Sequence, residues 1–228
     1  MTDGIDWQAI VLSIRLAFIV VVILLVIGAP LAWWITFRRR RWTFIIEAIV
    51  ALPLVLPPTV LGFYLLVAMG PRSPLGRVWE ALTGHGLAFT FEALVLASLL
   101  YSLPFVVQPI AAAFAQIDPT LLEASATLGA SPWRTFGRIT VPLARDCILA
   151  GTVLGFAHTL GEFGVVLMVG GNLPGITRTV SISIYDQVQS FQMEAANQTA
   201  LLLLGFSLAA LAAVYALLHK PWAIAPAA

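Results

Sequence analysis

Apolar residues in this sequence form long blocks separated by short polar segments. Five blocks are long enough to cross a membrane as helices, and they cover residues 10–37, 43–69, 89–115, 142–169 and 197–219. Leu16 to Phe37 contains no charged residue, and about 20 such residues cross a hydrocarbon core of about 30 Å. The blocks lack the polar face of a helix in a soluble bundle. The pattern therefore predicts an all-α integral membrane protein with five transmembrane helices.

Composition supports the membrane assignment. Of the residues, 60% are hydrophobic and 10% are charged, whereas soluble domains are roughly 25% charged. The net charge of +1 offers no basic surface for nucleic acid, and the lone Cys147 excludes an intramolecular disulfide and a cysteine metal cluster. The first block has no positive leader and exceeds the apolar region of a secretory signal, so we interpret it as a retained helix. The chain is expected to be one membrane domain, 1–228, with its core over about 10–219.

Basic residues favour one orientation of the spans, because cytoplasmic segments of membrane proteins are enriched in Arg and Lys. Four consecutive arginines, 38–41, follow the first block and are placed in the cytoplasm. Eight basic residues then face the cytoplasm: Arg38, Arg39, Arg40, Arg41, Arg134, Arg138, Arg145 and Lys220. Three face outward: Arg72, Arg77 and Arg178. This asymmetry predicts a multi-pass protein of the bacterial cell (inner) membrane, with the N-terminus outside and the C-terminus in the cytoplasm.

Prolines interrupt two of the spans. Pro53, Pro57 and Pro58 fall in the second and Pro104 in the third. An internal proline removes a backbone donor and clashes with the preceding turn, and the freed carbonyls must be covered by other helices or by a water-filled cavity. Two interpretations stay open: these prolines are packed kinks, or they shape and line a substrate path.

The segment from 118 to 142, named here the 118–142 loop, joins the third and fourth blocks on the predicted cytoplasmic side. Asp118 is a good N-cap with Pro119 at the first helical position, and Gly129 is the expected stop. Ser131 repeats the start signal for a second short helix, which Pro142 is expected to end. The pair either docks on a partner or packs back on its own membrane domain.

The same loop resembles the E-A-A-x3-G-x9-I-x-L-P motif of bacterial ABC importer permeases. Every spacing matches, and the matching residues are Glu123, Ala124, Gly129, Ile139 and Pro142. Ser125 and Val141 depart, standing where the motif has alanine and leucine. In that family the loop is the coupling helix that sits in a cleft of a separate ATPase.

Other segments resemble the molybdate and sulfate branch of that family. They are the run from Leu52 to Pro58, Gly161-Glu162-Phe163-Gly164, and Pro174-Gly175 with Thr177-Arg178-Thr179. His158 departs, because that branch often has arginine there. The resemblance implies a type I importer permease fold, a permease homodimer, a cytoplasmic ATPase dimer and a periplasmic or extracellular oxyanion-binding protein, with no cofactor. It favours molybdate as substrate; sulfate, thiosulfate or tungstate are the alternatives.

Two ionisable residues lie inside the fourth block. Glu162 is four residues after His158, so a continuous helix would place both on one face. A bare carboxylate on the path would repel a divalent oxyanion. We therefore interpret His158 and Glu162 as a structural polar pair, with Arg178 as another possible partner of Glu162.

The chain lacks the motifs of an enzyme or a metal protein. It contains no G-x-x-x-x-G-K-[ST] phosphate loop, no H-E-x-x-H and only three scattered histidines. A non-catalytic permease that depends on a partner ATPase is expected, with no metal site. Broken helices also suit a secondary transporter, but no repeated half is visible.

Overall fold

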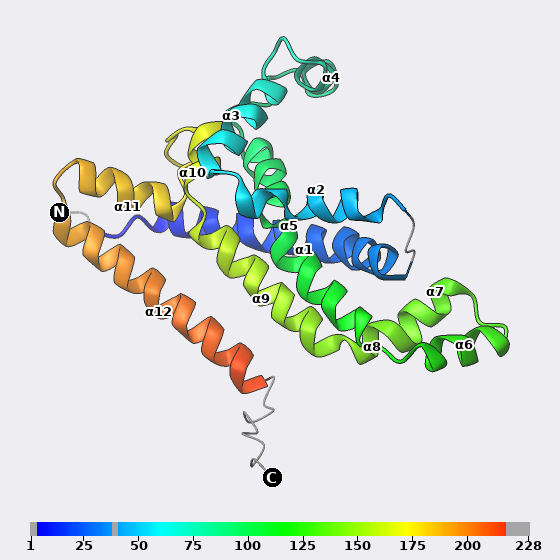
Figure 1. Ribbon diagram of the computed structural model, residues 1–228. Helices are drawn as coiled ribbons and strands as arrows, with labels where there is room; N and C mark the ends of the chain where they lie inside the picture. The colour runs from blue at the N-terminus through cyan, green and yellow to red at the C-terminus, as the bar shows by residue number, and fades with distance from the viewer. Residues whose placement is uncertain (1–3, 38–40, 218–228) are drawn as a thin grey trace.

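The computed structural model describes residues 4–37 and 41–217, and every regular element in these ranges is helical (Figure 1). The α-helices are α1 (Trp7–Phe37), α2 (Thr43–Val55), α3 (Pro58–Met69), α4 (Pro74–Thr83), α5 (Phe91–Ala115), α6 (Pro119–Thr127), α7 (Pro132–Thr135), α8 (Val141–Leu143), α9 (Arg145–Gly161), α10 (Gly164–Gly170), α11 (Val180–Gln189) and α12 (Met193–Leu217). A π-helical turn, Phe136–Thr140, joins α7 to α8. The all-α prediction is confirmed. The arginines at 38–40 and Lys220, which carried part of the predicted orientation, lie outside the described residues.

Three described helices, α1, α5 and α12, are each long and apolar enough to cross a membrane. The number rises to five when two bent pairs are each counted as one span. The pairs are α2 with α3, bent by 113°, and the helical segment Pro132–Leu143 with α9, bent by 77°. With both pairs counted, the described residues reach the predicted number of five spans. The break in the second span falls at the predicted prolines Pro57 and Pro58, whereas no break was predicted in the fourth.

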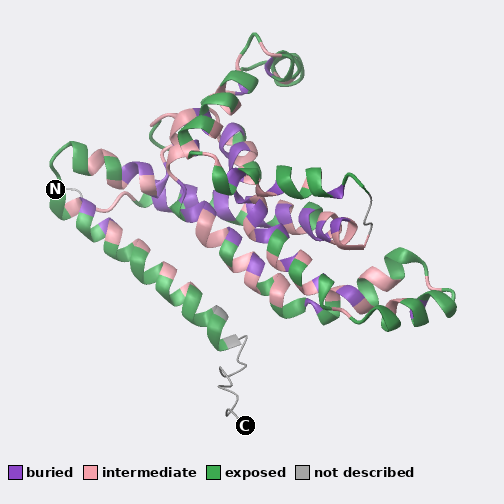
Figure 2. Ribbon diagram, in the orientation of Figure 1, coloured by how far each residue is buried: buried purple, intermediate pink, exposed green. Residues whose placement is uncertain are grey.

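The centre of the fold is the packing of α1, α5 and α9. Leu16, Val20 and Leu24 of α1 are completely buried, as is Val106 of α5 (Figure 2). Helix α9 approaches α5 so closely that a Cβ at Gly155 would lie 2.5 Å from a methyl carbon of Val106. Small residues in the fourth block thus allow the close helix contact that membrane interiors favour. By contrast, α12 is mostly exposed (Figure 2).

The second span breaks where two prolines follow each other. Leu56 (φ −71°, ψ 135°) ends α2 and Pro57 (φ −54°, ψ 134°) precedes α3. Proline disfavours the helical conformation of the residue before it, so Leu56 and Pro57 are both extended. Pro58 then occupies the first position of α3, where a missing N–H is no loss. Pro53 and Pro104 instead lie inside helices α2 and α5.

The fourth span differs from the expected continuous block 142–169. Helix α9 ends at Gly161, Glu162 is extended (φ −63°, ψ 135°) and α10 begins at Gly164. The sequence contains no proline at this point, so its apolar pattern did not predict the break. Two further helices were not predicted: α4, capped by the Ser73 side chain, and α11.

Candidate functional site

The two broken spans contact each other at their breaks. Helix α10 packs on α3, and a Cβ built at Gly164 would lie 2.8 Å from the Cβ of Pro58. A Cβ at Gly62 would similarly approach Met168 to 2.7 Å. The absence of side chains at these two glycines therefore permits the contact between the breaks.

A cavity of about 590 Å³ lies at this junction. Its lining includes Pro58 and Thr59 at the start of α3, Tyr101 of α5, His158 of α9 and Glu162. Of the candidate prolines, Pro58 alone is in this lining; Pro57 is its neighbour in the break. The sequence did not indicate Tyr101 or Thr59 as candidate site residues.

Glu162 is 4% exposed and is held by α5. Its Oε2 accepts a hydrogen bond of 2.7 Å from the Ser98 hydroxyl. Its Oε1 has no hydrogen-bond partner among the described residues. A buried acceptor without a partner is costly, so the bond from Ser98 is the one described side-chain contact that stabilises the Glu162 carboxylate.

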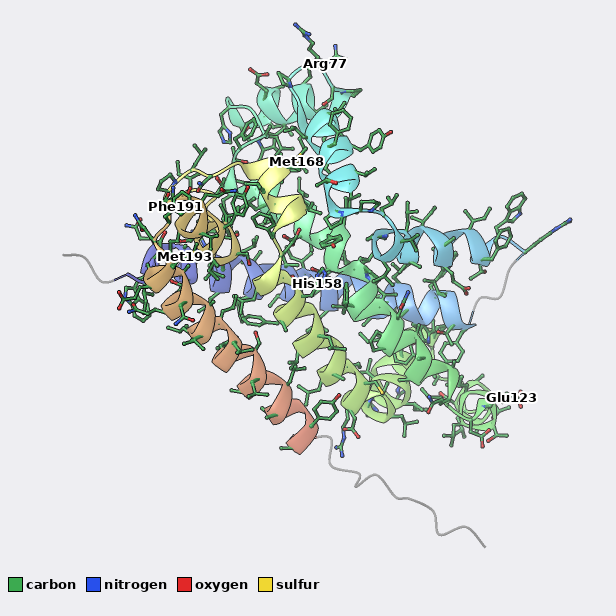
Figure 3. All side chains as sticks on the ribbon, turned by 60° about the vertical axis from the view of Figure 1, so that its left-hand side comes forward. Arg77, Glu123, His158, Met168, Phe191 and Met193 are labelled. Atoms are coloured by element: carbon green, nitrogen blue, oxygen red, sulfur yellow. The ribbon has the colours of Figure 1, made fainter. Side chains whose placement is uncertain are left out.

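His158 is bound to the same helix through a second serine. Its Nδ1 lies 2.9 Å from Ser102 Oγ, which lies 2.8 Å from Thr159 Oγ1. The Thr159 hydroxyl donates to the Gly155 carbonyl, so Ser102 donates to Thr159 and accepts from the N–H of His158 Nδ1. This chain of donors fixes the imidazole tautomer. The ring also stacks on Phe105 at 3.9 Å, in the middle of the helical body (Figure 3).

The structure does not form the expected direct contact of Glu162 with His158 or Arg178. Because α9 ends at Gly161, the spacing of four residues no longer places both side chains on one helical face. Each binds its own serine on α5 instead. Arg178 belongs to a separate network, with Asp186 at 3.6 Å, Asp6 at 3.9 Å and a hydrogen bond to Asn172.

The first half of the 118–142 loop has the predicted caps. The Asp118 side chain accepts from the Thr120 N–H at 2.9 Å, and the hydrogen bonds from Thr120 lower the pKa of the Asp118 carboxyl. Gly129 has φ +76°. The N–H of Ala130 bonds to the Ser125 carbonyl, and the N–H of Gly129 bonds to the Ala126 carbonyl. These two bonds are the Schellman motif that ends a helix with a left-handed residue.

The second half of the loop differs from the prediction that Pro142 ends a helix. Ser131 caps α7 as expected, but the helical path continues through the π-helical turn and α8 to Leu143. The Val141 N–H bonds to the Phe136 carbonyl, five residues back. This wider turn accommodates Pro142, and the bend into α9 falls at Ala144 (φ −95°, ψ 5°). Ile139 lies half-buried in the π-helical turn.

The loop is attached to the membrane body by α7 and the π-helical turn that follows it rather than by α6. Trp133 stacks on Trp33 of α1 at 6.2 Å between ring centroids, and Phe136 contacts both Trp33 and Phe114 of α5. Helix α6 is joined to α7 by the bond of 2.7 Å between the hydroxyls of Ser125 and Thr135. Ser125, the departure from the family motif, is thus a buried contact between the two helices.

Helix α6 projects from the rest of the protein, and Glu123, in the middle of α6, lies at the outer edge of the molecule (Figure 3). Glu123 and Ala124 are exposed, as is Leu128, at 87%. Of the two arrangements expected for the loop, packing on the chain's own membrane domain therefore applies to α7. Helix α6 instead presents an exposed surface. Pro142 is also exposed.

Residues 25–220 match the family described as binding-protein-dependent transport system inner membrane component. The chain belongs to this family.

Curated relatives agree with this assignment along most of the chain. A molybdenum transport system permease protein ModB from Azotobacter vinelandii is 52% identical over 92% of this chain and 93% of that protein. A protein of the same name from Escherichia coli K12 is 38% identical over 83% of this chain and 82% of that one. The predictions of a non-catalytic permease subunit and of an inner-membrane location are confirmed by these matches.

Solved ABC importers share the fold. A bacterial transporter for the acidic polysaccharide alginate aligns with a TM-score of 0.72 at 18% identity, covering 91% of this chain and 75% of that one. The inward-facing MetNI methionine transporter aligns with a TM-score of 0.72 at 16% identity, covering 94% of both chains. The predicted type I importer permease fold is therefore confirmed.

Proposed function

We propose that this permease forms, as a homodimer, the membrane path of an ATP-driven importer for molybdate. The observation that carries the choice of substrate is the 52% identity to a molybdenum transport permease over nearly the whole chain. Uptake of radiolabelled molybdate by cells with and without the gene tests it, with sulfate, thiosulfate and tungstate as competitors. Uptake of sulfate but not of molybdate would favour the sulfate alternative, and transport without any ATPase would favour a secondary transporter.

The cavity at the two helix breaks is the part of the path that this chain supplies. Its lining includes no Lys or Arg among the described residues. Without a fixed cation, a divalent oxyanion is held weakly there, and selectivity falls to the binding protein that delivers it. Weak binding suits a path, because a strongly bound anion would not leave it.

The surface of α6 is the proposed docking site for the ATPase. Leu121 and Leu128 offer exposed apolar area, 46% and 87%, beside the exposed Glu123 carboxylate. Burial of apolar area stabilises a complex by about 25 cal/mol per Å², and the carboxylate adds a specific polar contact. Two copies of α6 in a permease dimer would engage the two subunits of an ATPase dimer.

Orientation can be tested by cysteine labelling in a Cys147→Ser background. A thiol reagent that cannot cross the membrane is expected to label Leu82→Cys on α4, an exposed position, in intact cells. It is expected to label Arg41→Cys, also exposed, only after the membrane is permeabilised. The reverse pattern would show that the N-terminus is cytoplasmic.

A structural role for Glu162 makes a prediction about selectivity. Glu162→Gln keeps an oxygen that can accept from Ser98, so assembly, stability and the preference for molybdate over sulfate are expected to be unchanged. Glu162→Ala leaves the Ser98 hydroxyl without its partner and is expected to lower the free energy of unfolding by about 1–3 kcal/mol. Thermal unfolding and competitive uptake measure the two effects. A stable Gln variant with altered anion preference would make Glu162 a substrate ligand instead.

A further inference from the structure

A second cavity, of about 620 Å³, lies away from the helix breaks at the end of the protein where α1 and α5 begin. Its lining includes Trp7, Val11 and Arg15 of α1, Phe91 of α5 and Ile176 of the loop before α11. Phe91 is the first residue of α5, so this groove lies at the level where the helix enters the membrane. Neither the transport path nor the 118–142 loop accounts for it.

Arg15 is a cation without an acidic partner in this groove. Its guanidinium lies 4.6 Å above the Phe91 ring, and it takes part in no ion pair or hydrogen bond within the described residues. Asp6, on the same end of the chain, is already bound to Arg178, Ser183 and the Ala9 N–H. The charge of Arg15 is therefore available to an external anion.

Arg15 also lies within an exposed apolar stripe of α1. Positions 11, 15, 18, 22 and 26 follow the spacing of one helical face, and Val11, Phe18, Val22 and Val26 are 63%, 65%, 44% and 68% exposed. Val26 is 11 residues beyond Arg15, roughly 17 Å along the helix axis. That length is close to half of a hydrocarbon core of about 30 Å, which is the depth of one leaflet.

We propose that this groove binds one anionic phospholipid. The phosphate lies on the Arg15 guanidinium, whose planar fork of donors matches phosphate oxygens. The acyl chains lie along Phe18, Val22 and Val26, and Trp7 occupies the interfacial position that tryptophan favours in membranes. A free oxyanion would use Arg15 alone, whereas a lipid uses the cation and the apolar stripe together.

The test is lipid retention by the purified permease, measured by native mass spectrometry after titration with phosphatidylglycerol or phosphatidylcholine. The intact protein is expected to retain one phosphatidylglycerol in preference to phosphatidylcholine. Arg15→Gln is expected to weaken that retention about fivefold, the effect of one basic residue at an anionic surface. Arg15→Lys keeps the charge, and its retention of phosphatidylglycerol is expected to lie between that of the intact protein and that of Arg15→Gln. Arg72→Gln, which removes an exposed cation elsewhere, is the matched control.

Two outcomes would overturn the proposal. Equal retention by the Arg15→Gln and Arg72→Gln variants would show that Arg15 holds no lipid. Disulfide crosslinking of Phe18→Cys to a second copy, in the Cys147→Ser background, would assign the stripe to a permease interface. Lipid retention is measured without transport. The result can therefore be interpreted even if the permease proves not to transport molybdate.

Discussion

Replacing Gly129 by valine is expected to reduce coupled transport at least tenfold while leaving insertion and dimerisation unchanged. Gly129 has φ +76°, a conformation that costs other residues about 1–2 kcal/mol and a β-branched residue more. Without it the two hydrogen bonds from Ala130 and Gly129 that end α6 cannot both form. The exposed face around Glu123 would then be displaced from the ATPase. Uptake, ATPase binding and the amount of permease in the membrane measure the effect together.

Gly137 provides a matched control for this substitution. Like Gly129, it has no atom within 4 Å of an added Cβ, but its φ is not positive. Alanine at 137 should therefore be tolerated, whereas alanine at 129 should show a milder form of the valine defect. Normal uptake by Gly129→Val would refute the docking role of α6. A valine variant that failed to insert would instead contradict our assignment of the defect to the loop alone.

Replacing Pro57 and Pro58 together by alanine is expected to lower uptake severalfold without preventing insertion. The two prolines hold Leu56 and Pro57 extended and produce the 113° bend between α2 and α3. Alanine removes both restrictions and recovers about 3 kcal/mol per interior proline for a continuous helix. A straighter span would move position 58 away from Gly164 and change the cavity lining. Uptake per unit of inserted permease is the relevant measurement.

Pro74→Ala is the control for the double substitution. Pro74 also occupies the first turn of a helix, but α4 lies outside the junction and its start is capped by Ser73. This variant should transport normally. If the double alanine variant transports equally well, Pro57 and Pro58 are only packing features, which is the other interpretation of the sequence.

The features that the sequence predicted best are those encoded by neighbouring residues. The caps at Asp118 and Ser131 and the stop at Gly129 depend on hydrogen bonds that span at most five residues, and the apolar blocks identify the spans directly. The partner of Glu162 could not be found this way, because Ser98 is 64 residues away. The position of the Glu162 side chain also depends on where α9 ends. No proline or capping residue near Gly161 predicts that end.

The attachment of the 118–142 loop has a mechanical consequence. From Pro132 to Leu143 the chain is one helical rod, clamped at Trp133 and Phe136 by rings from α1 and α5 and hinged at Ala144 to α9. A load applied to α6 enters this rod through the Ser125–Thr135 contact. A displacement of α6 would therefore be passed to the aromatic contacts with α1 and α5 and, through Ala144, to the start of α9, 17 residues before the break beside the cavity.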